Sequence, residues 1–160
     1  MSGVEYQRED YWCGPATLHN AAYFLRHNSP GQAKIAGICG TTGELSTDEE
    51  DMMRGALYMG LVVDPYSSGS AIMFADWLVS TIRCGAVVAL CVDDWEHWVL
   101  AFGMLGAHIL VHDPANWERN VNNSGIRVYS EKGICTRVKA AKSTAGDLDN
   151  YYGIALYKKG

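Results

Sequence analysis

The sequence predicts an α+β fold in which an N-terminal layer of helices packs on an antiparallel β-sheet. Helical periodicity of apolar residues dominates the first half of the chain, whereas short apolar runs separated by tight polar turns dominate the second. At 160 residues, with 48% hydrophobic and 19% charged residues, the chain has the size and composition of one globular unit. We therefore expect residues 1–160 to form a single domain.

The first helix is expected to begin at Cys13 and to end before residue 28. Pro15 is suited to its first turn, and its apolar positions follow the i, i+3, i+4, i+7 pattern: Leu18, Ala21, Ala22 and Leu25. A short helix over residues 32–38 should follow.

Two further helices have recognisable ends. Thr47 and Glu50 predict a capping box for a helix that runs to about Met59. Residues 71–82 should form the next helix, and its inward-facing apolar positions would be Phe74, Leu78 and Ile82.

Strands are expected wherever short apolar runs are bounded by turn residues. The runs at 86–92, 97–104 and 108–112 predict a three-stranded meander with tight turns. Additional strands are expected at 61–63, 126–129 and 151–157. A sheet that follows helices in this way is typical of the α+β class.

Charge and hydropathy exclude several classes of partner. The formal net charge is -5, and Lys158–Lys159 is the strongest basic cluster, so we expect neither nucleic acid nor an anionic membrane as a partner. No apolar run approaches the roughly 20 residues of a membrane span, and the first residues do not resemble an export signal. We expect a cytoplasmic protein whose five cysteines are free thiols, four of them buried and one reactive.

Cys13 is the candidate for the reactive thiol. A cysteine at a helix start faces unpaired backbone N–H groups and the positive end of the helix dipole, which favour the thiolate. Its neighbours strengthen the case, because His97 opens one predicted strand and Asp113 follows the next. In an antiparallel hairpin the start of one strand lies beside the end of the next. An imidazole oriented by a carboxylate beside a thiol is the arrangement that activates a cysteine nucleophile.

These residues also allow two other interpretations. Any one cysteine of such a chain is more often a small buried apolar residue than a nucleophile. His108 and His112 share one face of a strand, but a lone histidine pair is more often structural than metal-binding. We therefore expect no metal and no cofactor.

The chain resembles the C39 cysteine peptidases, papain-like enzymes best known for trimming double-glycine leader peptides. The resemblance covers roughly the first three-quarters of the chain, and its motifs occur in family order: Tyr6-Gln7, Trp12-Cys13-Gly14-Pro15-Ala16-Thr17-Leu18, Cys39-Gly40-Thr41-Thr42, Ala56-Leu57-Tyr58-Met59-Gly60-Leu61, Gly85-Ala86-Val87-Val88-Ala89-Leu90, His97-Trp98-Val99-Leu100 and Val111-His112-Asp113-Pro114.

This resemblance implies a papain-like fold and a role for each site residue. Cys13 would attack the scissile carbonyl, His97 would act as general base and then acid, and Asp113 would orient the imidazole. The amide of Gln7 and the backbone N–H of Cys13 would form the oxyanion hole. Trp12 would flank the cleft, and the backbone of Glu96 would contact the substrate.

The expected activity is hydrolysis of a peptide or isopeptide bond through a thioester acyl-enzyme, with a peptide or protein as substrate. The same residues would also serve a glutamine deamidase or a transamidase, which differ in the amide that enters and in the nucleophile that resolves the acyl-enzyme. From a different class, a peptidase that has lost its activity would only bind peptides. The family's domains are commonly fused to an exporter, and this sequence contains no membrane or nucleotide-binding part, so the leader-peptide substrate does not follow from the resemblance.

Overall fold

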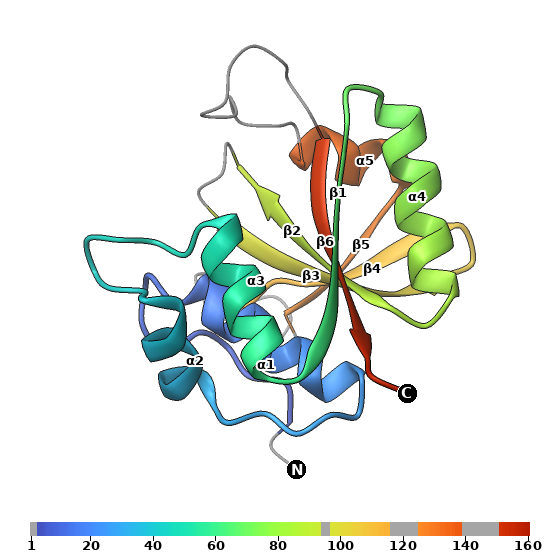
Figure 1. The fold of residues 1–160 in the computed structure, drawn as a ribbon. Coiled ribbons are helices and arrows are strands. Elements are labelled where there is room, and N and C mark those ends of the chain that lie inside the picture. The colour runs from blue at the N-terminus through green and yellow to red at the C-terminus, as the bar shows by residue number, and fades with distance from the viewer. Residues whose placement is uncertain (1–2, 94–96, 116–124, 139–150) are drawn as a thin grey trace.

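The computed structural model describes residues 3–93, 97–115, 125–138 and 151–160. Five helices and six strands lie in these ranges (Figure 1): α1 (Cys13–Phe24), α2 (Gln32–Cys39), α3 (Glu49–Tyr58), β1 (Leu61–Ser68), α4 (Ala71–Arg83), β2 (Val87–Val92), β3 (His97–Leu105), β4 (His108–His112), β5 (Ile126–Tyr129), α5 (Glu131–Arg137) and β6 (Tyr151–Lys158).

The strands of the described residues form one sheet in the order β1-β6-β2-β3-β4-β5, and every neighbouring pair is antiparallel. The meander predicted from the apolar runs is present as β2, β3 and β4. β6 lies between β1 and β2, so the last strand in sequence occupies an inner position. The predicted α+β class is confirmed.

Helices cover both faces of the sheet (Figure 1). All six residues of β2 are buried. Its odd-numbered residues belong to the core cluster of α1, α2 and α3, and its even-numbered residues to the cluster of α4. Because successive strand residues point to opposite faces, an unbroken apolar strand requires cover on each side. α4 and α5 therefore form a second layer beyond the expected N-terminal one.

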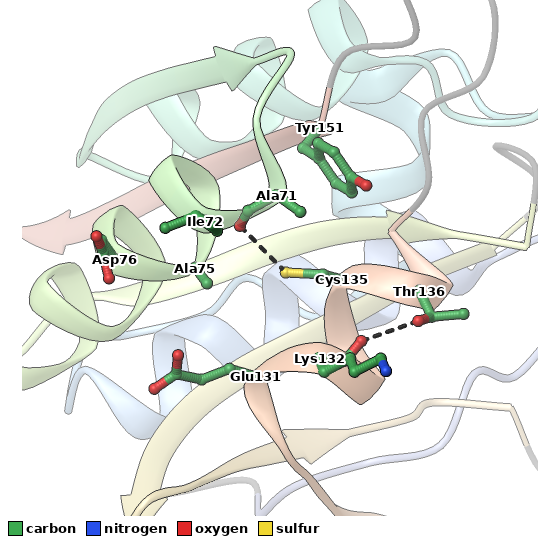
Figure 2. Close-up of a pocket in the computed structure, with 9 residues that line it drawn as sticks. All are labelled: Ala71, Ile72, Ala75, Asp76, Glu131, Lys132, Cys135, Thr136 and Tyr151. Atoms are coloured by element: carbon green, nitrogen blue, oxygen red, sulfur yellow. Dashed lines mark hydrogen bonds between the residues drawn. The ribbon is translucent and has the colours of Figure 1, made fainter.

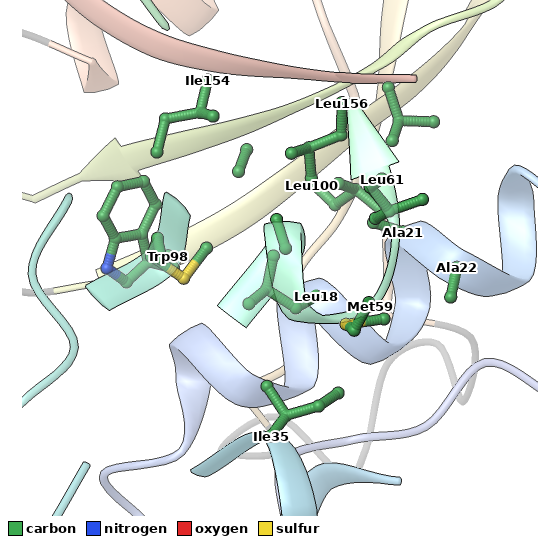
Figure 3. Packing of buried hydrophobic residues seen from close by; sticks show 14 of the residues in the cluster. Leu18, Ala21, Ala22, Ile35, Met59, Leu61, Trp98, Leu100, Ile154 and Leu156 are labelled. Carbon is green, nitrogen blue, oxygen red and sulfur yellow. The ribbon is translucent and has the colours of Figure 1, made fainter. Parts of the chain in front are cut away.

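The core cluster beneath α1 places this helix on the sheet (Figure 3). Leu18 of α1 and Trp98 of β3 are among its fully buried side chains. The Thr17 hydroxyl donates to the carbonyl of Trp98 at 3.2 Å, and the Trp98 indole donates to the carbonyl of Thr47 at 2.7 Å. The start of α1 is thereby fixed against the start of β3.

The predicted capping box of α3 is wrong. The N-cap is Asp48, whose carboxylate accepts from the backbone N–H of Asp51 at 2.8 Å. Thr47 is one residue too early, and its hydroxyl is instead 2.7 Å from that of Thr41. A carboxylate at this position also suits the positive end of the helix dipole.

Four of the five cysteines are buried, as expected, but Cys84 was expected among them and is not. All five are free, but Cys84 is exposed and Cys13 is buried with the other three. Cys84 follows α4 directly, in the connection to β2, and so it lies outside both core clusters. Within the part of the chain that the structure describes, no helix has the length and apolar character needed to cross a bilayer.

Candidate active site

Cys13 is the first residue of α1, and Trp12 is its N-cap. The first intrahelical bond runs from the Ala16 N–H to the Trp12 carbonyl at 2.9 Å, so the amides of Cys13 and Gly14 precede the hydrogen-bond ladder. The thiol therefore lies at the positive end of the helix, as the sequence predicts.

His97 and Asp113 meet at the ends of neighbouring strands. His97 Nε2 lies 2.6 Å from Asp113 Oδ1, and both side chains are about nine-tenths buried. The backbone N–H of Ala115 donates to the same oxygen at 3.0 Å and fixes the carboxylate. The adjacency inferred from the hairpin pattern is thus present in the structure.

The imidazole of His97 is shared between the thiol and the carboxylate. Burial by itself lowers the pKa of His97, but hydrogen bonds to Asp113 and Cys13 outweigh burial and raise this pKa to about 9. Burial likewise opposes ionisation of Asp113, yet the bond from His97 lowers the pKa of the carboxyl below its usual value. Since Nε2 faces Asp113, Nδ1 is left for Cys13. At neutral pH the protonated form of His97 is therefore favoured, between the Asp113 carboxylate and the sulfur of Cys13.

Gly14 allows the start of α1 to lie directly against Thr47. A Cβ at Gly14 would lie 2.6 Å from Thr47 Cβ and from its hydroxyl oxygen, closer than side chains approach each other. The sequence pattern indicates only that Gly14 is a small neighbour of the thiol. Its tight contact with Thr47 depends on residues distant in sequence, which no local pattern predicts.

Gln7 lies beside the Asp113–Pro114 segment, and the NH2 of its side-chain amide is already hydrogen-bonded. Its backbone N–H donates to the carbonyl of Pro114 at 2.9 Å, which places Gln7 next to Asp113. Its side-chain Nε2 donates to the carbonyls of Glu9 and Asp10 at 3.1 and 2.7 Å. Both amide hydrogens are thus held by the loop that leads into α1.

Of the two residues expected to contact substrate, the structure describes Trp12. Trp12 adjoins Cys13, is half-buried, and lies edge-to-face against Tyr11 with ring centroids 6.3 Å apart. Its indole N–H is buried and has no hydrogen-bond partner among the described residues. Glu96 lies outside the described residues.

The histidine pair considered for metal is divided between two environments. His108 is exposed, whereas His112 is buried with its Nδ1 at 3.3 Å from Asn20 Nδ2. Burial lowers the pKa of His112 to about 4, so the ring is neutral and accepts from Asn20. Across the described ranges, no group of three or more metal-ligating side chains comes together.

A groove between α4 and α5 is separate from these residues (Figure 2). It has a volume of about 510 Å³, and Ala71, Ala75 and Cys135 are among its apolar lining residues. Because α4 and α5 cover the sheet face opposite α1, the groove does not include Cys13.

Comparison with known proteins identifies the class of fold. No protein-family model matches the sequence, and no match was found among curated proteins. Solved structures do match: the peptidase domain of Streptococcus ComA, a bifunctional ABC transporter of a quorum-sensing pathway, aligns with a TM-score of 0.66 and 14% identity over 99% of this chain and 100% of that chain.

Two further structures agree. A double-glycine motif protease from an AMS/PCAT transporter, solved with its leader peptide, aligns with a TM-score of 0.61 and 16% identity over 96% of this chain and 88% of that one. A Bacillus anthracis protein described as a C39-like peptidase aligns with a TM-score of 0.66 and 9% identity over 99% and 95% of the two chains. The chain therefore has the papain-like fold of C39 peptidase domains.

Proposed function

We propose that the chain is a cysteine peptidase that hydrolyses a peptide or isopeptide bond, with Cys13 as nucleophile. The observation that carries this proposal is the buried imidazole of His97, which is hydrogen-bonded to Asp113 at 2.6 Å and to Cys13. A structural cysteine does not require a histidine held between it and a carboxylate. A nucleophile does, because the imidazole that takes the thiol proton and later returns it to the leaving group must be held in position.

In this mechanism the thiolate of Cys13 attacks the carbonyl carbon of the substrate, and His97 then gives its proton to the leaving amine. Water, deprotonated by His97, hydrolyses the resulting thioester and releases the acid. Asp113 keeps Nε2 occupied, so Nδ1 remains directed at the sulfur.

The oxyanion would be stabilised by the backbone N–H of Cys13 together with the Gln7 amide. Since both Gln7 hydrogens are held by loop carbonyls in the free protein, donation to the substrate requires release of one of them. Glu9 and Asp10 supply those carbonyls, so the loop that contains them would shift when the substrate binds. Trp12 and Glu96 are proposed to line the cleft, and the bound substrate would be an extended peptide.

The direct test is covalent labelling. At neutral pH a limiting amount of iodoacetamide should modify Cys13 before the other cysteines, as read by peptide mapping. Burial raises the pKa of Cys39 to about 12 and raises that of Cys91 and Cys135, so these thiols should react slowly. Cys84 is exposed and is the natural internal standard for an ordinary thiol. Labelling led by Cys84 would count against a nucleophile at Cys13.

Activity would then be measured by mass spectrometry on a peptide library. Cys13→Ala and His97→Ala should each abolish turnover, and Gln7→Ala should lower kcat by roughly 10²–10³ with little change in affinity. New carboxyl termini identify a peptidase, whereas a gain of about 1 Da at glutamine without cleavage identifies a deamidase. Peptide retention without any turnover in the unaltered protein would identify a binding module.

A further inference from the structure

The guanidinium of Arg137, at the end of α5, joins three separate elements. It bridges the carboxylate of Asp93, with Nη2–Oδ2 at 2.6 Å and Nε–Oδ1 at 3.3 Å. Its Nη1 donates to the hydroxyl of Tyr129 on β5 at 2.7 Å, and the guanidinium also lies 5.7 Å from the centre of that ring. The backbone adds a further link, because the Asp93 N–H donates to the Arg137 carbonyl at 3.3 Å.

Arg137 extends from a rigid support. Ile134, Cys135 and Val138 are buried in the core cluster between α4 and the sheet, so the backbone on either side of Arg137 is fixed. The arginine side chain is 25% exposed and Asp93 is 51% exposed. An ion pair this accessible contributes little to stability. The main effect of this ion pair is therefore to fix the position of Asp93, not to stabilise the fold.

Asp93 is the residue on which this geometry acts. It directly follows β2 and has φ of +57°, a left-handed conformation that is uncommon for a residue other than glycine. The preceding residue, Val92, is paired with His97 across the β2–β3 ladder. Holding Asp93 therefore holds the end of the ladder that carries the imidazole.

The charge of Arg137 also reaches the carboxylate partner of His97. The bond from His97 is the largest of the interactions that lower the pKa of Asp113, and the positive charge of Arg137 contributes in the same direction. Arg127 of β5 is a second cation near this carboxylate, with Nε 3.9 Å from Asp113 Oδ2.

We infer that Arg137 is a positioning residue that holds the Val92–His97 pair so that the imidazole reaches Cys13 and Asp113 together. The inference rests on the proposed function, because it concerns the geometry of the same base. It also gives a role to α5, which lies beyond the sequence motifs that the chain shares with the C39 peptidases.

The test uses the rate of Cys13 alkylation by iodoacetamide as a function of pH, measured in a Cys84→Ser background. Arg137→Met and Arg137→Lys should each slow the reaction roughly 10-fold or more, since small misplacements of a base are costly. Arg137→Lys should not restore the rate of alkylation, because an ammonium cannot bridge two carboxylate oxygens and a hydroxyl. Asp93→Asn preserves a residue that tolerates positive φ and should also slow the reaction.

A double variant tests whether Arg137 acts through Asp93. If Arg137 acts through Asp93, the double variant Arg137→Met/Asp93→Asn should react no more slowly than Arg137→Met alone. Additive losses would overturn the inference, and so would an unchanged rate and pH profile in folded Arg137→Met.

Arg54→Met is the matched control. Arg54 also pairs with an aspartate, Asp51, and donates to the carbonyls of Ile38 and Cys39, but it lies in the α2–α3 layer. The Arg54→Met variant should lower Tm without changing the pH profile of Cys13 alkylation. If Arg54→Met slowed alkylation as much as Arg137→Met does, the effect of Arg137 would be general destabilisation and the inference would be overturned. A Cys13 of ordinary reactivity in the parent protein would overturn the proposed function and this inference together. A fast Cys13 that is insensitive to Arg137→Met would overturn this inference alone.

Discussion

His97 Nε2 and Asp113 Oδ1 lie 2.6 Å apart although 16 positions separate the two residues in the chain. The β3–β4 ladder makes this contact, since Leu100 pairs with His112 and the two strands run antiparallel from that point. His97 begins β3 and Asp113 directly follows β4, so the backbone ladder brings the two residues together.

Asp113→Asn should lower the pKa of His97 below about 9, because the carboxylate is one of the groups that raise it. The asparagine oxygen still accepts from Nε2, so the ring keeps its orientation while turnover falls. Imidazole NMR titration measures the pKa directly. Asp64→Asn, on the exposed edge of the sheet, is the control and should leave the titration unchanged. An unaltered His97 pKa in Asp113→Asn would contradict the assigned partner.

Alkaline pH should weaken the fold through His97. Its pKa is about 9 in the folded protein, against 6.5 for a histidine in the unfolded chain, so the folded state binds the extra proton. The stabilisation is fully present below pH 6.5 and is lost as pH rises through about 9. Urea unfolding at a series of pH values should show this decline in the free energy of unfolding. The decline should be smaller in His97→Gln, and equal slopes in the two proteins would exclude the shift.

Acidification should weaken the fold through His112, because the pKa of His112 is lowered in the folded protein whereas that of His97 is raised. Its folded pKa is about 4, against 6.5 for a histidine in the unfolded chain, so the unfolded chain binds the proton first. Stability present above pH 6.5 is lost as pH falls toward 4, by on the order of 3 kcal/mol in total. His112→Gln should flatten the slope in the same urea series. His108→Gln, at an exposed position of the same strand, should not, and a slope retained in His112→Gln would assign the effect elsewhere.

Gly14→Ala should destabilise the protein by about 1–3 kcal/mol, because the added methyl group overlaps Thr47 at 2.6 Å. Alkylation of Cys13 should slow with it, since the start of α1 must move. Gly37→Ala in α2 is the matched control: nothing lies within 4 Å of its new Cβ, so stability should rise by roughly 0.5–1 kcal/mol. Thermal unfolding measures both, and a neutral Gly14→Ala would show that the α1–Thr47 contact is adaptable.

The sequence was most informative where structure is local. The runs at 97–104 and 108–112 predicted β3 and β4 almost to the residue, and with them the contact of His97 and Asp113. The start of α1 was predicted equally well, because a proline in the first turn and the spacing of the apolar residues from Leu18 onward depend only on the helix itself.

The rest depends on contacts between distant segments. α5 has seven residues, too few for a periodic pattern, and Arg137 meets Asp93 across 44 positions. The side-chain bonds of Gln7 to Glu9 and Asp10 follow from the path of one loop, which no apolar pattern encodes. Likewise, the run at 151–157 predicts a strand but does not predict that this strand lies between β1 and β2.

That inner position of β6 has a consequence for the newly made chain. During synthesis, Cys13, His97 and Asp113 leave the ribosome well before Tyr151–Lys158, yet β1 can join β2 only through β6. Ile154 and Leu156 also complete the core beneath α1, so that core stays open to water until the strand arrives. Insertion of this one strand therefore both links β1 to β2 and completes the core cluster to which Cys13 belongs.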